Sequence, residues 1–406
     1  MYTTSYIRKK GEFYHLVFEW SVNGKKNSKS VSTKSSDERL AKSLLPSFVA
    51  DCMKVYNLEE APKKEERNDI LNEVKKINIL DKEIRFIDFI YSYVKMKYKT
   101  VADNTYSSYH RIMINSLLPY FFKENKKLVE ITVYDIEKYY FHEMNFRNIS
   151  PNTISKYHTL LGMIFKQAMK LDLISKNPMF FVNKPKLNKY IANTYNASEI
   201  QDLLKLLKDN LDYRIIYCAC LIASYLGLRR EEILGIKWSS IDFENKILVI
   251  KSTVTETTLD GKTVLLKRNT TKTSKSDLRS FILPEVLVEM FIEMKEATEK
   301  NMIENKHFYI QDNIDYVFVN EIGEIIKPNY ITTKFGKIIR QHKLKKIRFY
   351  DLRHSCATLL LENNSNIKEV QAYLGHSSAK TTLDTYVHII NRNNSNSVDK
   401  ITQLLK

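Results

Sequence analysis

Apolar residues recur at helical spacing over most of the chain and at strand spacing in a few short segments. Between residues 81 and 183, apolar positions three or four residues apart predict a set of helices. Ser150 followed by Pro151 predicts the start of one helix, because serine caps a helix and proline suits its first turn. After residue 196 the helical pattern returns, interrupted by strand patterns at 247–250, 263–266, 280–283 and 316–319. We predict that these four strands form one small antiparallel sheet.

The first 57 residues begin with short strand patterns, of which residues 13–20 are rich in aromatic and branched side chains. Residues 13–20 and 29–33 are predicted to be strands, and Asn23-Gly24 between them predicts a hairpin turn. Ser36 then opens a helix. The predicted apolar side of this helix consists of Leu40, Leu44, Leu45, Phe48 and Val49. This part of the chain is therefore expected to be a small β-sheet with one helix.

Changes in composition divide the chain into domains and linkers. The charge-rich segment 58–80 and the lysine-rich segment 184–196 are predicted linkers. They separate an N-terminal module (1–57), a helical domain (81–183) and a larger mixed domain (197–390). The tail, 391–406, begins with a polar run and ends in a short amphipathic stretch, which must dock on another surface to be stable as a helix.

The overall charge favours a partner that carries negative charge. The 64 Lys and Arg residues outnumber the 47 Asp and Glu residues, giving a net charge of +17 and a pI of about 9.3. Such a balance is typical of proteins that neutralise DNA phosphates, although a lysine-rich proteome would also produce it. The four cysteines have no paired spacing and are predicted to be buried thiols. With no signal-peptide pattern and no long apolar run, we expect a cytoplasmic protein with no membrane partner.

Chemically active residue types stand at fixed offsets near the C-terminus. Arg353 lies at the head of a helical pattern, His376 follows a glycine that is predicted to end a short helix, and Tyr386 comes ten positions later. Upstream, Arg229 stands between two apolar helical stretches. Each of these residues alone would more often be an ordinary surface or turn residue. Together they suit attack by a phenol on a phosphodiester, because guanidinium groups stabilise the charge that develops on the non-bridging oxygens.

These motifs resemble those of the tyrosine recombinases, the integrase family of phages and conjugative transposons. The G-L-R-x-x-E pattern of that family is matched at 227–232, its second arginine block at 350–354 and its L-G-H-S-S block at 374–378. Tyr386 matches the nucleophile of the family. Lys272, in a segment similar to the family's β-hairpin, matches its general acid.

The resemblance implies a fold, an activity and a set of partners. The fold would be multidomain and mainly α-helical with small antiparallel sheets: an arm-type DNA-binding module, a helical core-binding (SAM-like) domain and an α+β catalytic domain. The protein would be a site-specific recombinase that works through a covalent 3′-phosphotyrosine, without cofactor or metal. Its partners would be double-stranded DNA at attachment sites and further copies in a tetramer. Arm-type sites, accessory excision or DNA-bending factors, and docking of the tail in cis or in trans remain open.

One position departs from the family pattern. Tyr350 stands three residues before Arg353, where the family usually has histidine. A phenol, with an ordinary pKa of about 10, donates a hydrogen bond but is a poor base near neutral pH. Tyr350 is therefore expected to position a phosphate oxygen or the Tyr386 hydroxyl, while His376, His354 or water accepts the proton. The expected site consists of Arg229, Lys272, Tyr350, Arg353, His376 and Tyr386.

Two other functions fit the same resemblance. A DNA-binding regulator could retain the fold and lose catalysis through the change at Tyr350. A type IB topoisomerase would share the chemistry but relax supercoils without sequence preference, and the N-terminal module argues against it. The sequence does not distinguish a phage from a conjugative transposon as the source, nor does it give the DNA target.

Overall fold

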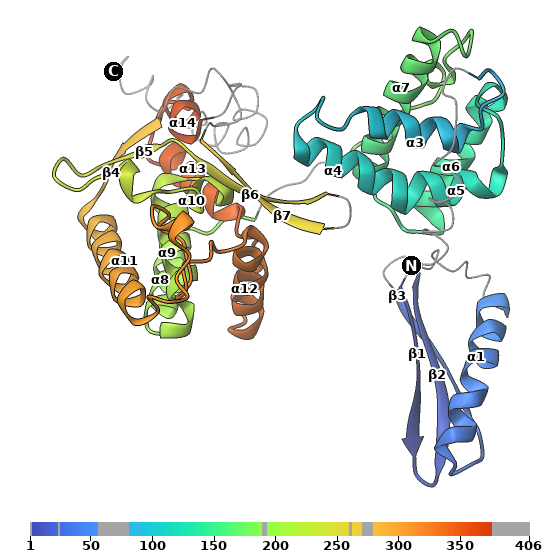
Figure 1. The fold of residues 1–406 in the computed structure, drawn as a ribbon. Helices are drawn as coiled ribbons and strands as arrows, with labels where there is room; N and C mark the ends of the chain where they lie inside the picture. Colours follow the sequence, from blue (N-terminus) through green and yellow to red (C-terminus); the bar gives the residue numbers. More distant parts are fainter. Residues whose placement is uncertain are drawn as a thin grey trace, which may run out of the picture. The chain divides into compact units, whose positions relative to one another are not determined.

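The computed structural model describes residues 2–22, 25–55, 81–188, 193–259, 262–269 and 279–375 (Figure 1). The chain divides into two compact units, Met1–Lys189 and Tyr190–Lys406. Both units are mainly helical with small antiparallel sheets, as the sequence predicts. In the described part of the chain, no helix combines the length and the apolar character that a membrane span requires.

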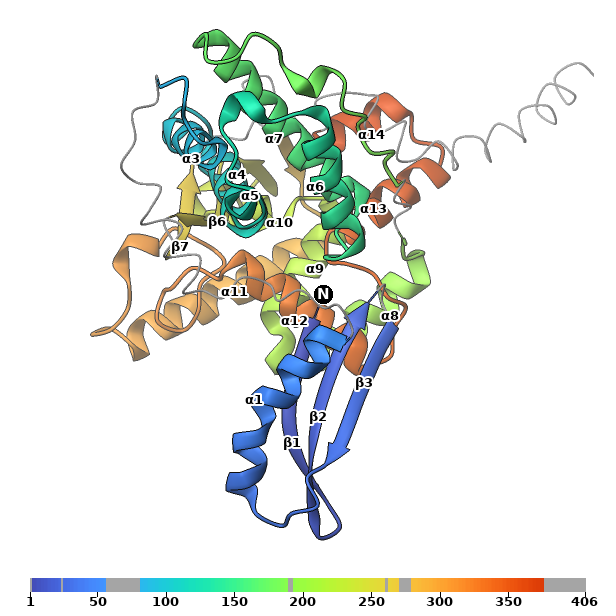
Figure 2. The same ribbon diagram turned by 90° about the vertical axis from the view of Figure 1, so that its right-hand side faces the viewer.

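The N-terminal part of the first unit is a three-stranded antiparallel sheet with a helix along it (Figure 2). Its elements are β1 (Tyr2–Lys10), β2 (Phe13–Val22), β3 (Lys25–Ser32) and α1 (Glu38–Val55). The central strand β2 pairs with both neighbours, as in Tyr6↔Val17 and Val17↔Ser30. Phe18 of β2 and Cys52 of α1 are buried against each other, and this contact seats the helix on the sheet.

Two details of this sheet and helix differ from the sequence prediction. The structure adds strand β1, whose polar and basic sequence gives no clear alternation of apolar residues. Leu40 and Leu44 were assigned to the apolar side of α1, but they are 45% and 41% exposed. The buried stripe runs instead through Ala41 and Cys52, because so small a sheet covers only a narrow strip of the helix.

Residues 81–188 of the first unit form a bundle of helices around aromatic side chains. It consists of α3 (Phe86–Met96), α4 (Asp103–Ile112), a π-helical turn (Met113–Leu117), α5 (Leu118–Glu124), α6 (Val133–Asn145) and α7 (Pro151–Lys170). The Phe86 ring packs edge-on against Phe121 and stacks on Phe165. The predicted helix start is confirmed, since the Ser150 hydroxyl accepts a hydrogen bond from the Thr153 N–H and Pro151 opens α7.

The second unit is built around α9 (Arg214–Leu226), in which nine of the 13 residues are buried. Around it pack α8 (Ala197–Lys208), α11 (Glu285–Glu304), α12 (Pro328–Gln341) and α13 (Asp351–Glu362). The described residues of this unit also form two shorter helices, α10 (Arg230–Ile233) and α14 (Ile367–Leu374). Helix α13 packs against α9. This packing brings residues that are more than a hundred positions apart in the chain into contact.

The strands of the second unit form two separate pairings, not the single predicted sheet. Strands β4 (Ile241–Asp242), β5 (Ile247–Ile250) and β8 (Arg279–Ile282) make one antiparallel sheet, and β6 (Thr253–Leu259) pairs with β7 (Lys262–Arg268) as a hairpin. The segment 316–319 was predicted to be a strand, and this prediction is wrong. It is irregular chain with single bridges to Lys237 and Ile325, and burial of Val317 and Phe318 explains its apolar pattern.

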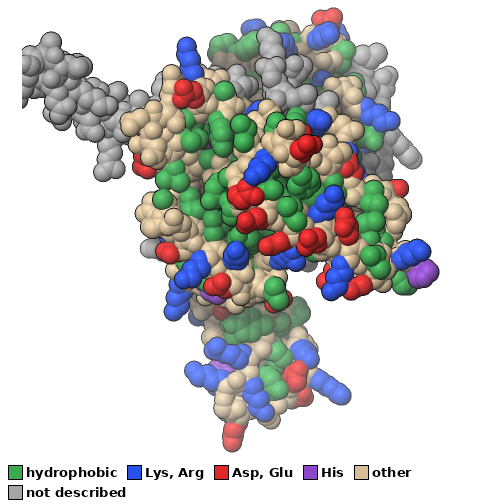
Figure 3. All heavy atoms as spheres, turned by 90° about the vertical axis from the view of Figure 1, so that its left-hand side faces the viewer, with side chains coloured by type: hydrophobic (Ala, Val, Ile, Leu, Met, Phe, Trp, Pro, Cys, Tyr) green, Lys and Arg blue, Asp and Glu red, His purple; other side chains and the backbone are tan. Residues whose placement is uncertain are grey.

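Charged side chains of both signs are spread over the face of the molecule drawn in Figure 3, with apolar side chains among them. Although the net charge is +17, the described residues of that face do not form one continuous basic surface. The four cysteines are buried thiols that form no disulfide with one another, in agreement with the prediction.

Candidate active site

Arg229 is placed by a sharp reversal of the chain between α9 and α10. Gly227 ends α9 in the left-handed region at φ +59°, where a residue without a Cβ is favoured. A Cβ at Gly227 would also lie 2.6 Å from Cδ2 of Leu374, so α14 approaches the backbone there. Arg229 follows as the N-cap residue of α10. Its guanidinium donates hydrogen bonds to Glu232 Oε1 (2.7 Å) and to the Gly375 carbonyl oxygen (3.2 Å).

Arg353 lies in the first turn of α13 and is only 1% exposed. Its Nη1 donates to the Gly227 carbonyl oxygen and its Nη2 to the Leu374 carbonyl oxygen, both at 2.6 Å. Burial, and then the neighbouring charge of Arg229, lower the pKa of Arg353 to about 10, so the side chain stays charged at neutral pH. Its Nε is also buried and finds no hydrogen-bond partner within the described ranges.

Glu232 connects the two predicted arginines through one buried carboxylate. Its Oε1 lies 2.7 Å from Arg229 Nη1 and 2.7 Å from Arg279 Nη2, and its Oε2 lies 4.0 Å from Arg353 Nη1. Burial alone would raise the pKa of Glu232, but Arg279 and then Arg229 outweigh it and hold the pKa below its usual range. The carboxylate is therefore ionised at neutral pH, and we refer to Arg229, Glu232, Arg279 and Arg353 as the arginine cluster.

The arginine cluster holds the C-terminal end of α14. Gly375 caps this helix at φ +65°, which confirms the prediction that the glycine ends it. Arg279 donates to the carbonyl oxygens of Tyr373 and Leu374, Arg353 donates to Leu374, and Arg229 donates to Gly375. Carbonyl groups at a helix end lack partners in the helix and carry its partial negative charge, so guanidinium groups suit them well.

Tyr350 stands at the entrance to α13, on the same helix start as Arg353. It is 41% exposed, and its ring meets the His354 ring edge-on with centroids 5.1 Å apart. Burial lowers the pKa of His354, so its imidazole is neutral near pH 7. The buried Asp351 accepts hydrogen bonds from the backbone N–H and the guanidinium of Arg348, which fixes this turn.

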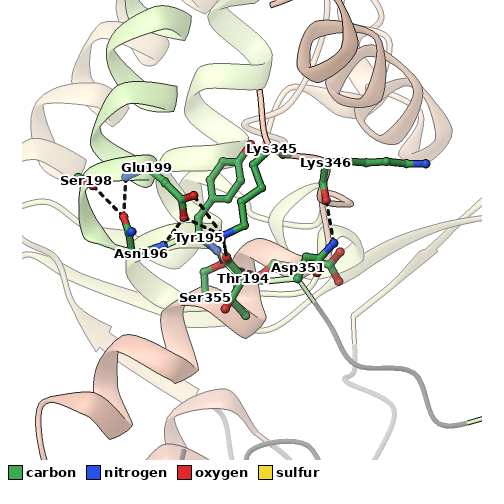
Figure 4. A network of polar contacts seen from close by, with 10 residues as sticks. Thr194, Tyr195, Asn196, Ser198, Glu199, Lys345, Lys346, Asp351 and Ser355 are labelled. Atoms are coloured by element: carbon green, nitrogen blue, oxygen red, sulfur yellow. Dashed lines mark hydrogen bonds and ion pairs between the residues drawn. The ribbon is translucent and has the colours of Figure 1, made fainter. Parts of the chain in front are cut away.

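A second network fixes α13 from the side of α8 (Figure 4). The Tyr195 backbone N–H donates to the Ser355 hydroxyl at 2.9 Å. The Lys345 ammonium donates to the Thr194 carbonyl oxygen at 2.8 Å and pairs with Glu199 at 3.1 Å. Because these bonds join the start of α8 to the chain before α13 and to its second turn, Arg353 rests on a rigid element.

Three of the six predicted site residues are described, and the structure gathers two of them. Arg229 and Arg353 meet at Glu232 and at the end of α14, and Tyr350 lies at the start of the helix that carries Arg353. Lys272, His376 and Tyr386 lie outside the described residues, although His376 directly follows Gly375. Sequence reasoning missed Arg279, which is one cation among 64 and stands in no motif that we recognised.

Charge replacement at Glu232 should destabilise the fold. In Glu232→Gln the amide no longer compensates three neighbouring guanidinium groups, and we expect the free energy of unfolding to fall by about 3 kcal/mol. Denaturant unfolding measures the change. The matched control is Glu231→Gln, because the Glu231 carboxylate pairs with Arg230 nearer the surface. This substitution should lower the free energy of unfolding by less than about 1 kcal/mol. Equal losses in the two variants would contradict the assigned role of Glu232.

The arrangement can bind an oxyanion of the phosphate type. Three positive charges face one carboxylate, and guanidinium forks match the geometry of phosphate oxygens. Arg229 and Arg353 lie on backbone that packing holds in place, and the donors that now bind Glu232 and backbone carbonyl oxygens would turn toward the anion.

Comparison with known proteins gives one consistent result. The chain matches the phage integrase family over residues 193–392 and the phage integrase SAM-like domain over residues 85–184. It is 26% identical over 360 residues to a "Tyrosine recombinase XerC-like" protein of Caldanaerobacter subterraneus, covering 85% of this chain and 89% of that protein. It is 27% identical over 304 residues to the ICEBs1 integrase of Bacillus subtilis, covering 74% and 78%.

Solved structures agree in fold. The Tn1549 transposon integrase in complex with a circular intermediate DNA superposes with a TM-score of 0.60 at 18% identity, covering 75% of this chain and 95% of that one. A lambda integrase dimer bound to a COC′ core site gives a TM-score of 0.52 at 15% identity and covers 93% of both chains.

Proposed function

The chain belongs to the phage integrase family of tyrosine recombinases, and we therefore propose that it is the integrase of a phage or a conjugative transposon. It is an enzyme that breaks and rejoins DNA at specific sites. The observation that carries the proposal is the placement of Arg229 and Arg353, which reach one helix end from two different elements. The family match continues to residue 392 and so includes Lys272, His376 and Tyr386.

In the proposed reaction the Tyr386 hydroxyl oxygen attacks the scissile phosphorus. The bond to the 5′ oxygen breaks, Lys272 gives that oxygen a proton, and the 3′ end remains joined to the enzyme as a phosphotyrosine. Arg229, Arg353 and His376 stabilise the charge on the non-bridging oxygens. A 5′ hydroxyl of the partner duplex then attacks the phosphotyrosine and restores a phosphodiester. The proton of Tyr386 passes to His376, to water or to His354, whose neutral ring can accept it.

The proposed assembly is a tetramer on two DNA duplexes in the cytoplasm. The helical domain would bind core DNA together with the catalytic domain, and the tail at 391–406 would dock in trans or in cis. The proposal that the N-terminal sheet contacts arm-type sites is supported by its exposed cations Arg8, Lys9, Lys10 and Lys29. That lambda integrase is described as a dimer on its core site supports assembly on DNA.

A trapping experiment tests this function. The protein is incubated without metal with nicked duplexes carrying candidate ends of the element, and a denaturing gel detects covalent protein–DNA adducts. An adduct on one sequence and not on a scrambled duplex supports the integrase. Sequence-specific binding with no adduct would support the regulator on the same fold, and relaxation of supercoils without sequence preference would support the topoisomerase.

Substitution of Tyr350 separates the integrase from the regulator. Its half-exposed phenol lies at the start of the helix that carries Arg353, which suits a donor to the phosphate. We therefore expect Tyr350→Phe to slow adduct formation by about tenfold, the effect of one neutral hydrogen bond. Tyr350→His should keep at least the original rate, since imidazole can also accept a proton. Single-turnover cleavage at saturating DNA measures both. If only Tyr350→His forms an adduct, the natural protein is the regulator.

A further inference from the structure

Arg279 is a member of the arginine cluster to which the proposed reaction assigns no role. It is the first described residue after segment 270–278 and opens strand β8, where it pairs with Ile250. Its side chain is only 11% exposed. A charged side chain that is so little exposed contacts other parts of the protein and not solvent.

The contacts of Arg279 tie three elements together. Its Nη2 lies 2.7 Å from Glu232 Oε1 at the end of α10, and its Nη1 donates to the carbonyl oxygens of Tyr373 (3.2 Å) and Leu374 (2.8 Å) in α14. The strand that carries Arg279 also presents Phe281, which meets the Tyr373 ring edge-on. One side chain thus holds β8, α10 and the end of α14 in a single arrangement.

The fit of Arg279 depends on the absence of a side chain at Gly375. A Cβ at Gly375 would lie 2.7 Å from Nε of Arg279 and 2.9 Å from its Cδ and Cζ. The guanidinium therefore lies directly against the residue that precedes His376.

Arg279 gives Glu232 a charged partner in addition to Arg229 and Arg353. Glu232 now accepts from Arg229 and Arg279 through the same oxygen, and Arg353 is more distant. When Arg229 turns a donor toward a phosphate, the buried carboxylate still needs a charged partner. Arg279 is the partner that can stay, because it lies 2.7 Å from Glu232 Oε1, whereas Arg353 lies 4.0 Å from the carboxylate.

We propose that Arg279 is a positioning residue for strand cleavage: it holds Glu232 and the end of α14 while Arg229 and Arg353 engage the phosphate. This inference rests on the proposed function. It predicts that Arg279 affects the chemical step and not the affinity for DNA. It also predicts that the effect does not pass through the general acid Lys272, although Lys272 belongs to segment 270–278, which Arg279 directly follows.

The test compares Arg279→Met and Arg279→Lys in single-turnover cleavage of the nicked duplex at saturating concentration. Arg279→Met should cleave about 10- to 100-fold more slowly because the reacting groups are displaced. Its DNA dissociation constant should change by less than about twofold, since only the chemical step is affected. Arg279→Lys keeps the charge near Glu232 but cannot also reach both carbonyl oxygens, so its rate should be intermediate. Arg214→Met, at an exposed arginine of α9, is the matched control and should cleave normally.

A duplex with sulfur in place of the 5′ bridging oxygen makes the test specific, because a thiolate leaves without a proton donor. The slow cleavage by Arg279→Met should persist on this DNA. Restoration of the original rate would overturn the proposal, since the defect would then lie with Lys272. If Arg279→Met does not fold, Arg279→Lys decides: slow cleavage with unchanged binding supports the proposal, and an unchanged rate overturns it.

Failure of this inference and failure of the proposed function give different results. If both Arg279 variants cleave at the original rate while Tyr386→Phe does not cleave, only the role of Arg279 is wrong. If Tyr386→Phe still forms the adduct, the assignment of the nucleophile is wrong whatever the Arg279 variants do.

Discussion

Tyr386→Phe should abolish formation of the covalent adduct while leaving DNA binding unchanged. The substitution removes the single oxygen that becomes bonded to phosphorus, and loss of a nucleophile lowers a rate by on the order of 10⁶-fold. Phenylalanine keeps the aromatic ring, so the hydroxyl group is the only part of the side chain that is lost. The measurement is adduct yield on nicked DNA against time, together with the dissociation constant for the same duplex.

The matched control for Tyr386→Phe is Tyr330→Phe, which removes the same hydroxyl group from a half-exposed tyrosine of α12. Tyr330 has no role in the proposed reaction, so this variant should form the adduct at the original rate. An adduct of normal yield in Tyr386→Phe would show that another group attacks the phosphate, and this result would contradict the proposed mechanism.

Arg353→Lys should slow cleavage by about 100- to 1000-fold, the effect of removing one preorganised donor from such a site. Lysine keeps the charge, but a single ammonium cannot replace a planar fork that already donates to the carbonyl oxygens of Gly227 and Leu374. Single-turnover cleavage measures the rate, and thermal unfolding checks that the fold survives.

Arg230→Lys is the control for Arg353→Lys. Arg230 lies in α10 beside Arg229, but its guanidinium binds Glu231 and Thr332 and takes no part in the arginine cluster. We expect at most a small change in its cleavage rate. Equal rates for Arg353→Lys and the original protein would mean that Arg353 serves only to hold α14.

The sequence predicted those parts of the site that depend on local chain geometry. The glycine that ends α14 was predicted because a residue with positive φ at a helix end favours glycine. Arg353 was placed correctly in the first turn of its helix because the apolar spacing after it is regular. In both cases the signal lies within a few residues of the feature.

Features that depend on contacts between distant residues could not be predicted. The role of Glu232 rests on Arg279 and Arg353, which come from a strand and a helix far along the chain. The segment 316–319 had the composition of a strand, yet its residues are buried in irregular chain. Strand β6 was missed because its threonines and Glu256 give no clean alternation. The amino-acid composition of a segment indicates whether the segment is buried. It does not indicate which other part of the chain covers that segment, because this depends on the fold.

The position of the covalent bond between protein and DNA decides whether the proposed mechanism is right. The original protein is trapped on a nicked duplex with the end of the element, digested with a protease and analysed by mass spectrometry. We predict that the DNA is joined through its 3′ phosphate to the peptide that contains Tyr386. A 3′ phosphate joined to a different residue, or specific binding with no joined peptide at all, would contradict this mechanism.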